Sequence, residues 1–370
     1  IIEKIMSERE KVKIAVIGGG AFGTAMCTMA ARAGHNVYLY VRDEQQAQIM
    51  QITHKNPKYL NEFLLHDNIN ISNDLHHVLH GALLIILAIP AQTVPKWLED
   101  HRDIIDPQVL ILNTAKGLYL KEKKLLSEAV VEALGRPQPY ALLSGPSFAK
   151  EMMLDMPTAV VVASRFLYNA VAVQRMLSTE RFRIYASQDM IGVELGGALK
   201  NPLAIGAGML EGMSMGINTI SAYVTRSSME LMELCKAMGG EPHTISGLSG
   251  IGDLMLTAFG EMSRNRTFGK KLAQGEKLVD LLRTTTVEGV PTAQVAVYFA
   301  DKCGLELPIF RSVASIIEGE ELLENVHLDL LGKVAQGLEI NPTTIDNPYY
   351  RPPPVAYSRL RGLSTDYTSS

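Results

Sequence analysis

The chain has 370 residues, of which 47% are hydrophobic and 20% are charged, and its formal net charge is −4. This length favours two domains with a large core, and the slightly acidic balance gives no electrostatic reason to expect binding to nucleic acid. Cys27, Cys235 and Cys303 lie far apart without a CxxC pair, which indicates a reducing compartment and no disulfide framework. The longest apolar run, Ala82–Ala91, is too short to span a membrane and predicts a buried strand.

The first residues, IIEKIMSEREK, include no methionine at position 1 and lack the cleavage pattern of a secretory signal. Their charged and apolar residues follow helical spacing, so they resemble the end of a longer helix. We therefore expect that upstream sequence, either a domain or a transit segment, has been removed. The expected compartment is the cytoplasm, with the plastid stroma, after loss of an N-terminal segment, as the alternative.

Strands and helices alternate through the first half of the chain. Apolar or alternating runs predict strands at Lys13–Ile17, Asn36–Val41, Leu83–Ile89, Val109–Asn113, Tyr140–Ser144 and Ala159–Ala163. A polar helix follows the second of these strands, and a further helix is predicted at Lys124–Leu134. This alternation predicts an α/β domain with a doubly wound parallel sheet over residues 1–188.

Beyond residue 188 the strand signal nearly disappears. Helical periodicity dominates residues 189–340 and is punctuated by glycine pairs and prolines, so we predict an all-α domain there, with the boundary near Gln188. Residues 341–370 contain NPYYRPPPVAY and predict an extended, proline-rich tail.

A glycine-rich turn directly follows the first predicted strand. Gly18, Gly20 and Gly23 form GxGxxG before a predicted helix, where glycines permit a tight turn, close approach to a pyrophosphate and helix–strand packing. The context predicts a dinucleotide site, and a glycine-rich structural turn is the alternative. Asp43, about twenty residues on, favours NAD, whereas the neighbouring Arg42 could pair with the 2′-phosphate of NADP.

Residues 196–216 read GGALKNPLAIGAGMLEGMSMG and place Lys200 among glycines and apolar side chains. Each glycine costs about 1 kcal/mol relative to alanine inside a helix, so something must approach this backbone closely. One interpretation is a kinked packing helix whose lysine extends to the surface. The other is a functional lysine.

Seven motifs occur in a fixed order: GGGAFGTA (18–25), NTAKG (113–117), SGPSFAKE (144–151), ALKN (198–201), GLSGIGDLMLT (247–257), SRNR (263–266) and VEG (287–289). Together they resemble the NAD(P)-dependent glycerol-3-phosphate dehydrogenases, from about Lys11 to Leu338. The resemblance implies a Rossmann-type domain followed by a helical domain. It also implies reversible hydride transfer between NAD(H), with NADP(H) possible, and sn-glycerol 3-phosphate or dihydroxyacetone phosphate. A homodimer is expected by analogy, with the glycine-rich helix buried at its interface.

The resemblance makes Lys200 the general acid and base that exchanges a proton with the substrate oxygen. An amine can do this if burial or nearby cations lower its pKa. Gly192 and Gly196 fall on the face of Lys200 at helical spacing, where small residues would leave room for nicotinamide and substrate. Lys116 is implied as a second cation near the reacting carbonyl, although a surface lysine in a turn is the alternative.

Asp253 is implied to orient the catalytic lysine, and Thr257, four residues later on the same helical face, completes the polar network. A capping or structural role for Asp253 is the alternative. Substrate binding is implied for Lys116, Gly145, Ser147, Thr257, Ser263, Arg264 and Asn265. Arginine with serine and asparagine suits a phosphate, although SRNR could also be a solvated loop.

Cofactor binding is implied for a second set of residues: Gly18, Gly20, Ala21, Phe22, Gly23, Arg42, Pro90, Lys116, Ala149, Arg264 and Glu288. Capping or packing is the alternative for Pro90 and Glu288. Position 202 is usually aliphatic in this family, and Pro202 is expected to remove a hydrogen bond to the carbonyl of Ala198 and to bend the helix beside the lysine.

His76 and His80 have the i, i+4 spacing of a metal pair, but no third ligand is evident and Asp74 suits an N-cap, so we expect a solvated helix face and no metal. Two other functions remain open. One is a dehydrogenase of the same plan acting on a hydroxy acid, and the other is a non-catalytic protein that senses dinucleotides.

Overall fold

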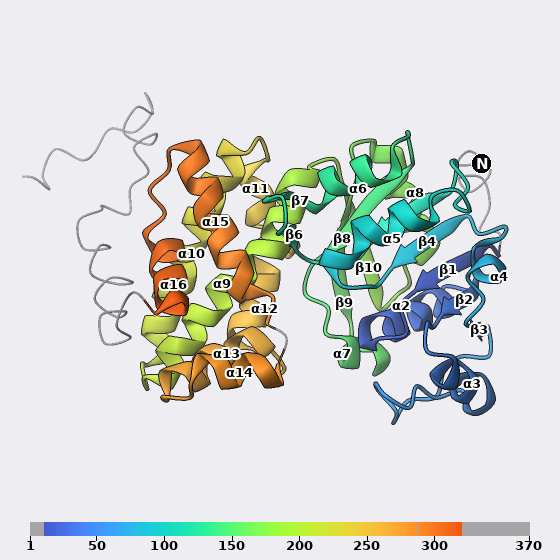
Figure 1. Ribbon diagram of the computed structural model, residues 1–370, viewed down its shortest axis with the longest axis horizontal. Helices are drawn as coiled ribbons and strands as arrows, with labels where there is room; N and C mark the ends of the chain where they lie inside the picture. Colours follow the sequence, from blue (N-terminus) through green and yellow to red (C-terminus); the bar gives the residue numbers. More distant parts are fainter. Residues whose placement is uncertain (1–10, 286, 320–370) are drawn as a thin grey trace, which may run out of the picture.

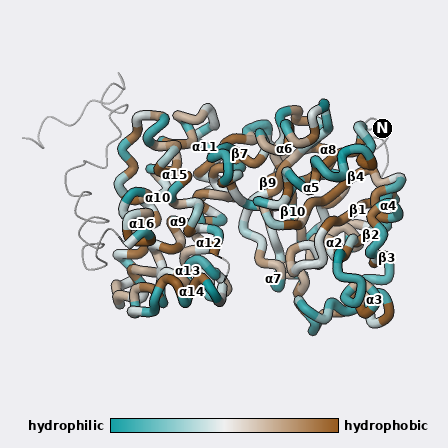
Figure 2. Tube along the Cα trace, in the orientation of Figure 1, coloured by the Kyte–Doolittle hydropathy of each residue, from teal (hydrophilic) through white to brown (hydrophobic). Residues whose placement is uncertain are grey.

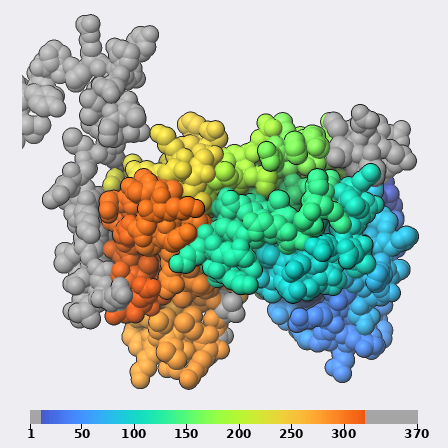
Figure 3. Space-filling model, turned by 45° about the horizontal axis from the view of Figure 1, so that its top comes forward, coloured from blue at the N-terminus to red at the C-terminus, as the bar shows by residue number. Residues whose placement is uncertain are grey.

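The computed structural model describes residues 11–285 and 287–319, and the predicted tail at 341–370 lies outside them. The chain forms a sheet flanked by helices up to residue 187 and an array of helices from residue 190 (Figure 1). These two parts pack directly against each other, as the space-filling view shows (Figure 3).

The sheet has eight strands in the order β10-β9-β8-β5-β4-β1-β2-β3. Their bounds are β1 Lys13–Ile17, β2 Asn36–Tyr40, β3 Ile69–Ser72, β4 Leu84–Leu87, β5 Leu110–Asn113, β8 Tyr140–Ser144, β9 Thr158–Ala163 and β10 Phe182–Ser187. The six strands predicted from sequence are all present, with bounds that differ by no more than two residues at either end. The edge strands β3 and β10 were not predicted, because short half-polar strands resemble loops in sequence.

The sheet is mostly parallel, as expected for this fold class, but β8 and β9 pair antiparallel. Strands β9 and β10 therefore run against the other six. The helix between β8 and β9, α7 (Ala149–Met153), has only five residues. At about 1.5 Å per residue it is too short to carry the chain back along a strand. The doubly wound parallel sheet is therefore present as predicted, apart from the antiparallel pairing at this edge.

Helices cover both faces of the sheet because successive strand residues point to opposite sides. Ile14 and Val16 of β1 face a core formed with α2 (Ala21–Arg32), α3 (Glu44–Thr53), α7 and α8 (Leu167–Leu177). Ala15 and Ile17 face the other core, formed with α4 (Leu75–Leu79), α5 (Val94–His101) and α6 (Leu126–Leu134). Figure 2 shows brown along the central strands and teal on much of the outer helices and loops.

A small hairpin joins the two parts of the chain. Strands β6 (Leu118–Tyr119) and β7 (Lys124–Leu125) pair antiparallel, so the helix predicted at 124–134 begins two residues later than expected. Leu118 and Leu125 pack into the core of the helical part, not that of the sheet. The ammonium of Lys123 lies 4.7 Å from the ring centroid of Tyr298 in the helical part.

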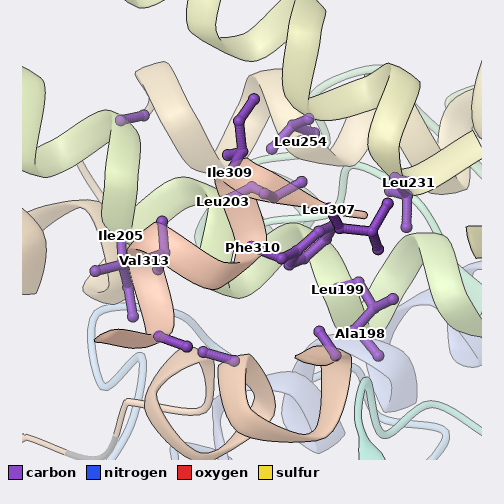
Figure 4. Close-up of a cluster of buried hydrophobic side chains, with 14 of the residues drawn as sticks. Ala198, Leu199, Leu203, Ile205, Leu231, Leu254, Leu307, Ile309, Phe310 and Val313 are labelled. Carbon is purple, nitrogen blue, oxygen red and sulfur yellow. The ribbon is translucent and has the colours of Figure 1, made fainter. Parts of the chain in front are cut away.

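The helical part contains α9 (Met190–Gly212), α10 (Ile217–Ala237), α11 (Pro242–Ile245), the π-helical turn η2 (Leu248–Gly252), α12 (Asp253–Phe259), α13 (Arg264–Ala273), α14 (Leu278–Thr284), α15 (Gly289–Cys303) and α16 (Pro308–Glu318). Helix α9 is buried from Gly192 to Leu210. Figure 4 shows its Leu199 and Leu203 among apolar side chains of α10, α12 and α16.

The glycines of α9 let helix α13 approach at backbone distance. A Cβ on Gly208 would lie 2.0 Å from the carbonyl oxygen of Arg266, and a Cβ on Gly269 would lie 2.0 Å from that of Ile205. Helix α9 continues through the buried Pro202 to Gly212. The glycines are therefore explained by packing within one chain, and the expectation that α9 is buried at a dimer interface was wrong.

Glu194 of α9 anchors the helical part to the sheet part. Its two carboxylate oxygens accept hydrogen bonds from the backbone N–H (2.9 Å) and the hydroxyl (2.6 Å) of Ser127, in the first turn of α6. The carboxylate thus caps a helix of the other part, where negative charge is favoured. Burial raises the pKa of Glu194 to about 7, against the opposing hydrogen bonds from Ser127.

We expect this carboxyl to make stability fall as pH rises from about 4.5 to 7. The folded state binds the proton of Glu194 more tightly than the unfolded chain does, so unfolding releases a proton in this window. Wild-type protein should lose about 1–3 kcal/mol more unfolding free energy between pH 5 and 8 than Glu194→Gln. Urea unfolding at both pH values measures this. Glu180→Gln, on an exposed turn, is the control, and an unchanged loss in Glu194→Gln would contradict the prediction.

Candidate active site

Lys200 is buried in the middle of α9, with only 6% of its surface exposed. Its ammonium donates to the hydroxyl of Thr257 at 2.7 Å and lies 3.3 Å from Oδ1 of Asp253. A buried lysine keeps its charge at acceptable cost only with such partners. The packing interpretation required the lysine to extend to the surface, and it does not.

Asp253 lies between two lysines. Its Oδ2 is 2.6 Å from the ammonium of Lys116, which comes from the sheet part, while Oδ1 faces Lys200. Asp253 begins α12, which packs beside α9 (Figure 1). The hydroxyl of Thr257, one turn later, donates to the backbone carbonyl of Asp253 at 2.6 Å. One carboxylate thus joins cations from both parts of the chain.

Lys116 follows the carboxyl end of β5, where ligands bind in sheets of this kind. Besides its ion pair with Asp253, it donates to the carbonyl oxygen of Gly145 at 2.7 Å, at the end of the neighbouring β8. Its side chain is 18% exposed, so it is no surface lysine in a free turn.

The electrostatic surroundings of Lys200 favour proton exchange. Burial lowers the pKa of Lys200 below its usual value, and the charge of Lys116 lowers it further, while Asp253 acts in the opposite direction. Because burial is the largest contribution, the ammonium releases its proton more readily than a surface lysine does. A lowered pKa is the property that a lysine needs to act as a general acid and base.

The turn after β8 lies beside this cluster. Gly145 has φ +133°, and a Cβ there would lie 3.0 Å from the Cα of Val160, so only glycine fits. The hydroxyl of Ser147, which is buried, donates to the carbonyl of Gly145 at 3.0 Å. Ala149 is the first residue of α7, and no side chain caps the N-terminus of that helix. Gly145 and Ser147 are thus brought to Lys116.

The SRNR segment divides into two roles. Ser263 caps α13 by accepting from the N–H of Arg266, and Arg266 pairs with Glu211 of α9 at 2.7 Å. Arg264 is exposed at the first turn of α13, so its guanidinium is accessible to a ligand. The second arginine of the motif is therefore structural, and the first is accessible.

Asn265 holds the site together. Its amide donates to Oδ1 of Asn201 at 3.0 Å and accepts from the N–H of Gly289 at 3.0 Å. It thereby ties α13 to α9 beside Lys200 and to the start of α15. Asn201 was not among the residues selected from the sequence, although its place directly after Lys200 was a usable signal.

Glu288 precedes α15 and faces the cations of the site. Burial raises the pKa of its carboxyl, while the charges of Arg264, Lys200 and Lys116 oppose that rise. Glu288 therefore interacts electrostatically with all three cations. No side-chain hydrogen bond caps α15, so capping does not explain Glu288.

The glycine-rich turn fits a dinucleotide. Gly18 has φ +121°, and a Cβ there would lie 2.4 Å from the carbonyl of Ala88. A Cβ on Gly23 would lie 1.9 Å from the carbonyl of Gly18, so β1 and α2 need glycine at both positions. Gly20 is the N-cap of α2, has open space around it and provides no side-chain cap. The first N–H groups of α2, at Ala21 and Phe22, therefore point to space suited to a phosphate.

Two further residues lie at this edge of the sheet. Pro90 follows β4 and precedes the short 3-10 turn η1 (Ala91–Thr93). The hydroxyl of Thr93 donates to the carbonyl oxygen of Pro90. Arg42 follows β2 and is exposed. The sheet topology places both residues beside the β1–α2 turn, because β4 and β2 flank β1.

The sequence-based interpretation of Gly192 and Gly196 was wrong. A Cβ on Gly196 would lie 2.7 Å from the carbonyl oxygen of Ser249, and one on Gly192 would lie 2.9 Å from Cβ of Thr244. These glycines pack against α11 and η2, so they leave no room for nicotinamide or substrate.

Two family models cover most of the chain. Residues 13–169 match the model described as NAD-dependent glycerol-3-phosphate dehydrogenase N-terminus, and residues 189–327 match the corresponding C-terminus. The chain belongs to this family. The predicted fold class, the enzyme class and a nicotinamide dinucleotide as the cofactor are thereby confirmed.

Individual relatives agree with the family assignment. The chain is 42% identical to "Glycerol-3-phosphate dehydrogenase [NAD(+)] 2, chloroplastic" of Arabidopsis thaliana, over 86% of this chain and 77% of the relative. It is 38% identical to glycerol-3-phosphate dehydrogenase [NAD(P)+] of Lawsonia intracellularis, over 83% and 89% of the two chains. The solved structure of glycerol-3-phosphate dehydrogenase from Coxiella burnetii superposes with a TM-score of 0.81 at 33% identity, covering 87% and 99%.

Within residues 11–285 and 287–319, no helix is long and apolar enough to cross a membrane. Among the same residues, no three histidine, cysteine, aspartate or glutamate side chains gather in a way that could hold a metal ion. Asp74 caps α4 by accepting from the N–H of His77, in agreement with the predicted N-cap.

Proposed function

We propose that the protein catalyses reversible hydride transfer between NAD(P)(H) and the pair sn-glycerol 3-phosphate and dihydroxyacetone phosphate. The observation that carries this proposal is the buried Lys200–Asp253–Lys116 cluster, which joins the two parts of the chain at the same carboxyl edge of the sheet as the glycine-rich turn. Membership of the family supports the substrate assignment. When bound, the dinucleotide supplies or accepts the hydride.

Lys200 acts as the general acid and base in this proposal. Its ammonium gives a proton to the substrate oxygen as the ketone is reduced, and the neutral amine takes the proton back in the reverse direction. Burial favours the neutral amine, while Asp253 at 3.3 Å favours the ammonium, so both forms are accessible. Thr257 fixes the direction of the lysine side chain by accepting from it.

Lys116 and Asp253 support this step. Lys116 is held in place by Gly145 and Asp253, and its charge would polarise the substrate carbonyl and favour a developing oxyanion. Asp253 orients both ammonium groups at once. Arg264 and Asn265 bind the substrate phosphate in this proposal, because arginine can grip phosphate through two N–H groups and Asn265 adds a neutral donor. Ser263 stands at the same helix end.

Cofactor binding rests on the β1–α2 turn. Backbone N–H groups at Gly20, Ala21 and Phe22 would face the pyrophosphate, and the dipole of α2 adds positive potential there. In this proposal Pro90, Ala149 and Glu288 also contact the bound dinucleotide. The division at Gln188 then separates the dinucleotide-binding domain (1–188) from the helical substrate domain (189–340).

The direct test follows the oxidation of NADH and NADPH by the purified protein with dihydroxyacetone phosphate. We expect rapid turnover that requires the phosphate ester, because in this proposal Arg264 and Asn265 bind a phosphate rather than the carboxylate of a hydroxy acid. Dihydroxyacetone without phosphate, and pyruvate as a 2-oxo acid, are the comparison substrates. Dinucleotide binding without turnover on any of them would favour the sensing function instead.

Assembly and compartment are further parts of the proposal. The homodimer interface is proposed to lie away from the buried α9, at the sheet edge β10, where Tyr185 is exposed. Light scattering of the purified protein measures the mass. Cys27, Cys235 and Cys303 are free thiols, which suits the cytoplasm or the plastid stroma.

A further inference from the structure

The end of β2 decides which dinucleotide a fold of this kind accepts. An acidic residue there accepts hydrogen bonds from the ribose hydroxyls of NAD, whereas a cation there accommodates the 2′-phosphate of NADP. This chain carries both, as Arg42 and Asp43, so the sequence alone leaves the choice open.

Both carboxylate oxygens of Asp43 have partners within the protein, although the side chain is 46% exposed. Its Oδ1 accepts from the backbone N–H of Gln46 at 2.9 Å and so caps α3. Its Oδ2 pairs with the ammonium of Lys58 at 2.6 Å. The hydrogen bond from Lys58, followed by that from Gln46, holds the pKa of Asp43 below its usual value. The acid is therefore ionised and neutralised by a lysine fifteen residues away.

The position of Lys58 is fixed by the cofactor turn. Asn56, which is fully buried, donates to the carbonyl of Gly19 at 3.0 Å and to the hydroxyl of Thr24 at 2.9 Å. Its side-chain oxygen accepts from the backbone N–H of Lys58 at 3.1 Å. The segment that carries Lys58 is thus bound to the glycine-rich turn, and its ammonium is held beside the ribose end of the dinucleotide site.

The charges at this end then favour a phosphate. Asp43 and Lys58 cancel each other, and Arg42 remains exposed beside them. The next acid, Glu44, accepts a hydrogen bond at 3.2 Å from the side-chain amide of Gln48, one turn later in α3. A 2′-phosphate approaching Arg42 therefore meets a neutral ion pair and not a bare carboxylate.

We propose that Lys58 is a specificity-determining residue, which opens the site to the 2′-phosphate of NADP(H) by neutralising Asp43. The inference rests on the proposed function, since it concerns the same dinucleotide site. Without Lys58, the carboxylate would repel a 2′-phosphate but could still accept a ribose hydroxyl.

Calorimetric binding of 2′,5′-adenosine bisphosphate and of 5′-AMP tests this without any turnover. Lys58→Met should weaken binding of the bisphosphate about tenfold and leave 5′-AMP within about twofold, because only the former brings charge to the 2′ position. Lys55→Met, an exposed lysine three residues earlier, should leave both affinities unchanged.

A double variant separates neutralisation from direct contact with the phosphate. Asparagine still caps a helix, so Asp43→Asn keeps α3 while removing the charge. Added to Lys58→Met, it should restore most of the binding of the bisphosphate. Absence of rescue, or an equal loss for both ligands, would overturn the role of Lys58. If the wild-type protein bound neither ligand, the proposed function itself would fail.

Discussion

Lys200→Met is expected to lower kcat by about 10³- to 10⁴-fold while binding of NADH is retained. The substitution removes the group that exchanges a proton with the substrate oxygen, and general acid–base catalysis is typically worth 10²- to 10⁴-fold. Methionine has a similar shape and suits the buried surroundings in α9. Steady-state rates with dihydroxyacetone phosphate, together with NADH binding followed by fluorescence, measure the two effects separately.

Lys236→Met is the matched control, because Lys236 is an exposed lysine of the same helical part. It should retain full activity. Lys200→Arg should not recover turnover, since a guanidinium keeps its proton at any working pH. Near-normal turnover in Lys200→Met would assign the proton exchange to another group and leave Lys200 a packing role.

Lys200→Met should also be at least as stable to urea as the wild type. A buried ammonium loses its hydration, and Lys200→Met removes that cost without leaving an unpaired buried charge, because the carboxylate beside it has another cation as partner. Asp253 would keep its second partner, Lys116, at 2.6 Å. Loss of rate with unchanged or higher resistance to urea would show that Lys200 is retained for chemistry.

The sequence predicted the parts of the site that depend on local pattern. Strand β1 and its glycine-rich turn follow from a short apolar run and from glycine spacing, and both are where they were expected. Lys116, Lys200 and Asp253 were selected from motifs far apart in the chain. Their meeting around one carboxylate depends on the packing of α9 and α12 against the end of the sheet, which no local pattern reveals.

The errors have physical causes of the same kind. Gly192 and Gly196 were assigned to ligand space, but they make room for protein atoms of Thr244 and Ser249. A small residue signals close approach without saying what approaches. The pairing of Asp43 with Lys58 was also invisible, because the buried amide of Asn56 brings the lysine back across the intervening helix.

Asp253→Asn should shift the pH dependence of turnover to lower pH and lower kcat by about 10²-fold. The carboxylate of Asp253 favours the protonated form of Lys200, and the charge of Lys116 disfavours it. Without the carboxylate, only the repulsion from Lys116 remains, so the pKa of Lys200 falls further. The loss in rate follows because two ammonium groups are no longer held in position, and small displacements of catalytic groups carry costs of this size.

The rates of the two reaction directions depend on pH with opposite slopes, but a lower pKa of Lys200 moves both profiles the same way. Reduction of the ketone needs protonated Lys200, so its rate falls as pH rises through the pKa, and in the variant this fall comes at lower pH. Oxidation needs the neutral amine, so its rise with pH also moves to lower pH. Rates in both directions across the pH range measure the shift, with Asp67→Asn on an exposed loop as the control.

Stability supplies an independent check on the same variant. Removing one partner of a buried ion pair typically costs about 3–5 kcal/mol, because the remaining charge is left without compensation. Lys200 can relieve part of this cost by releasing its proton, and that release is what the shifted profile reports. A large fall in rate with unmoved profiles would mean that Asp253 positions the lysines without controlling the proton. A matching shift in both directions would tie orientation and proton affinity to the one carboxylate between them.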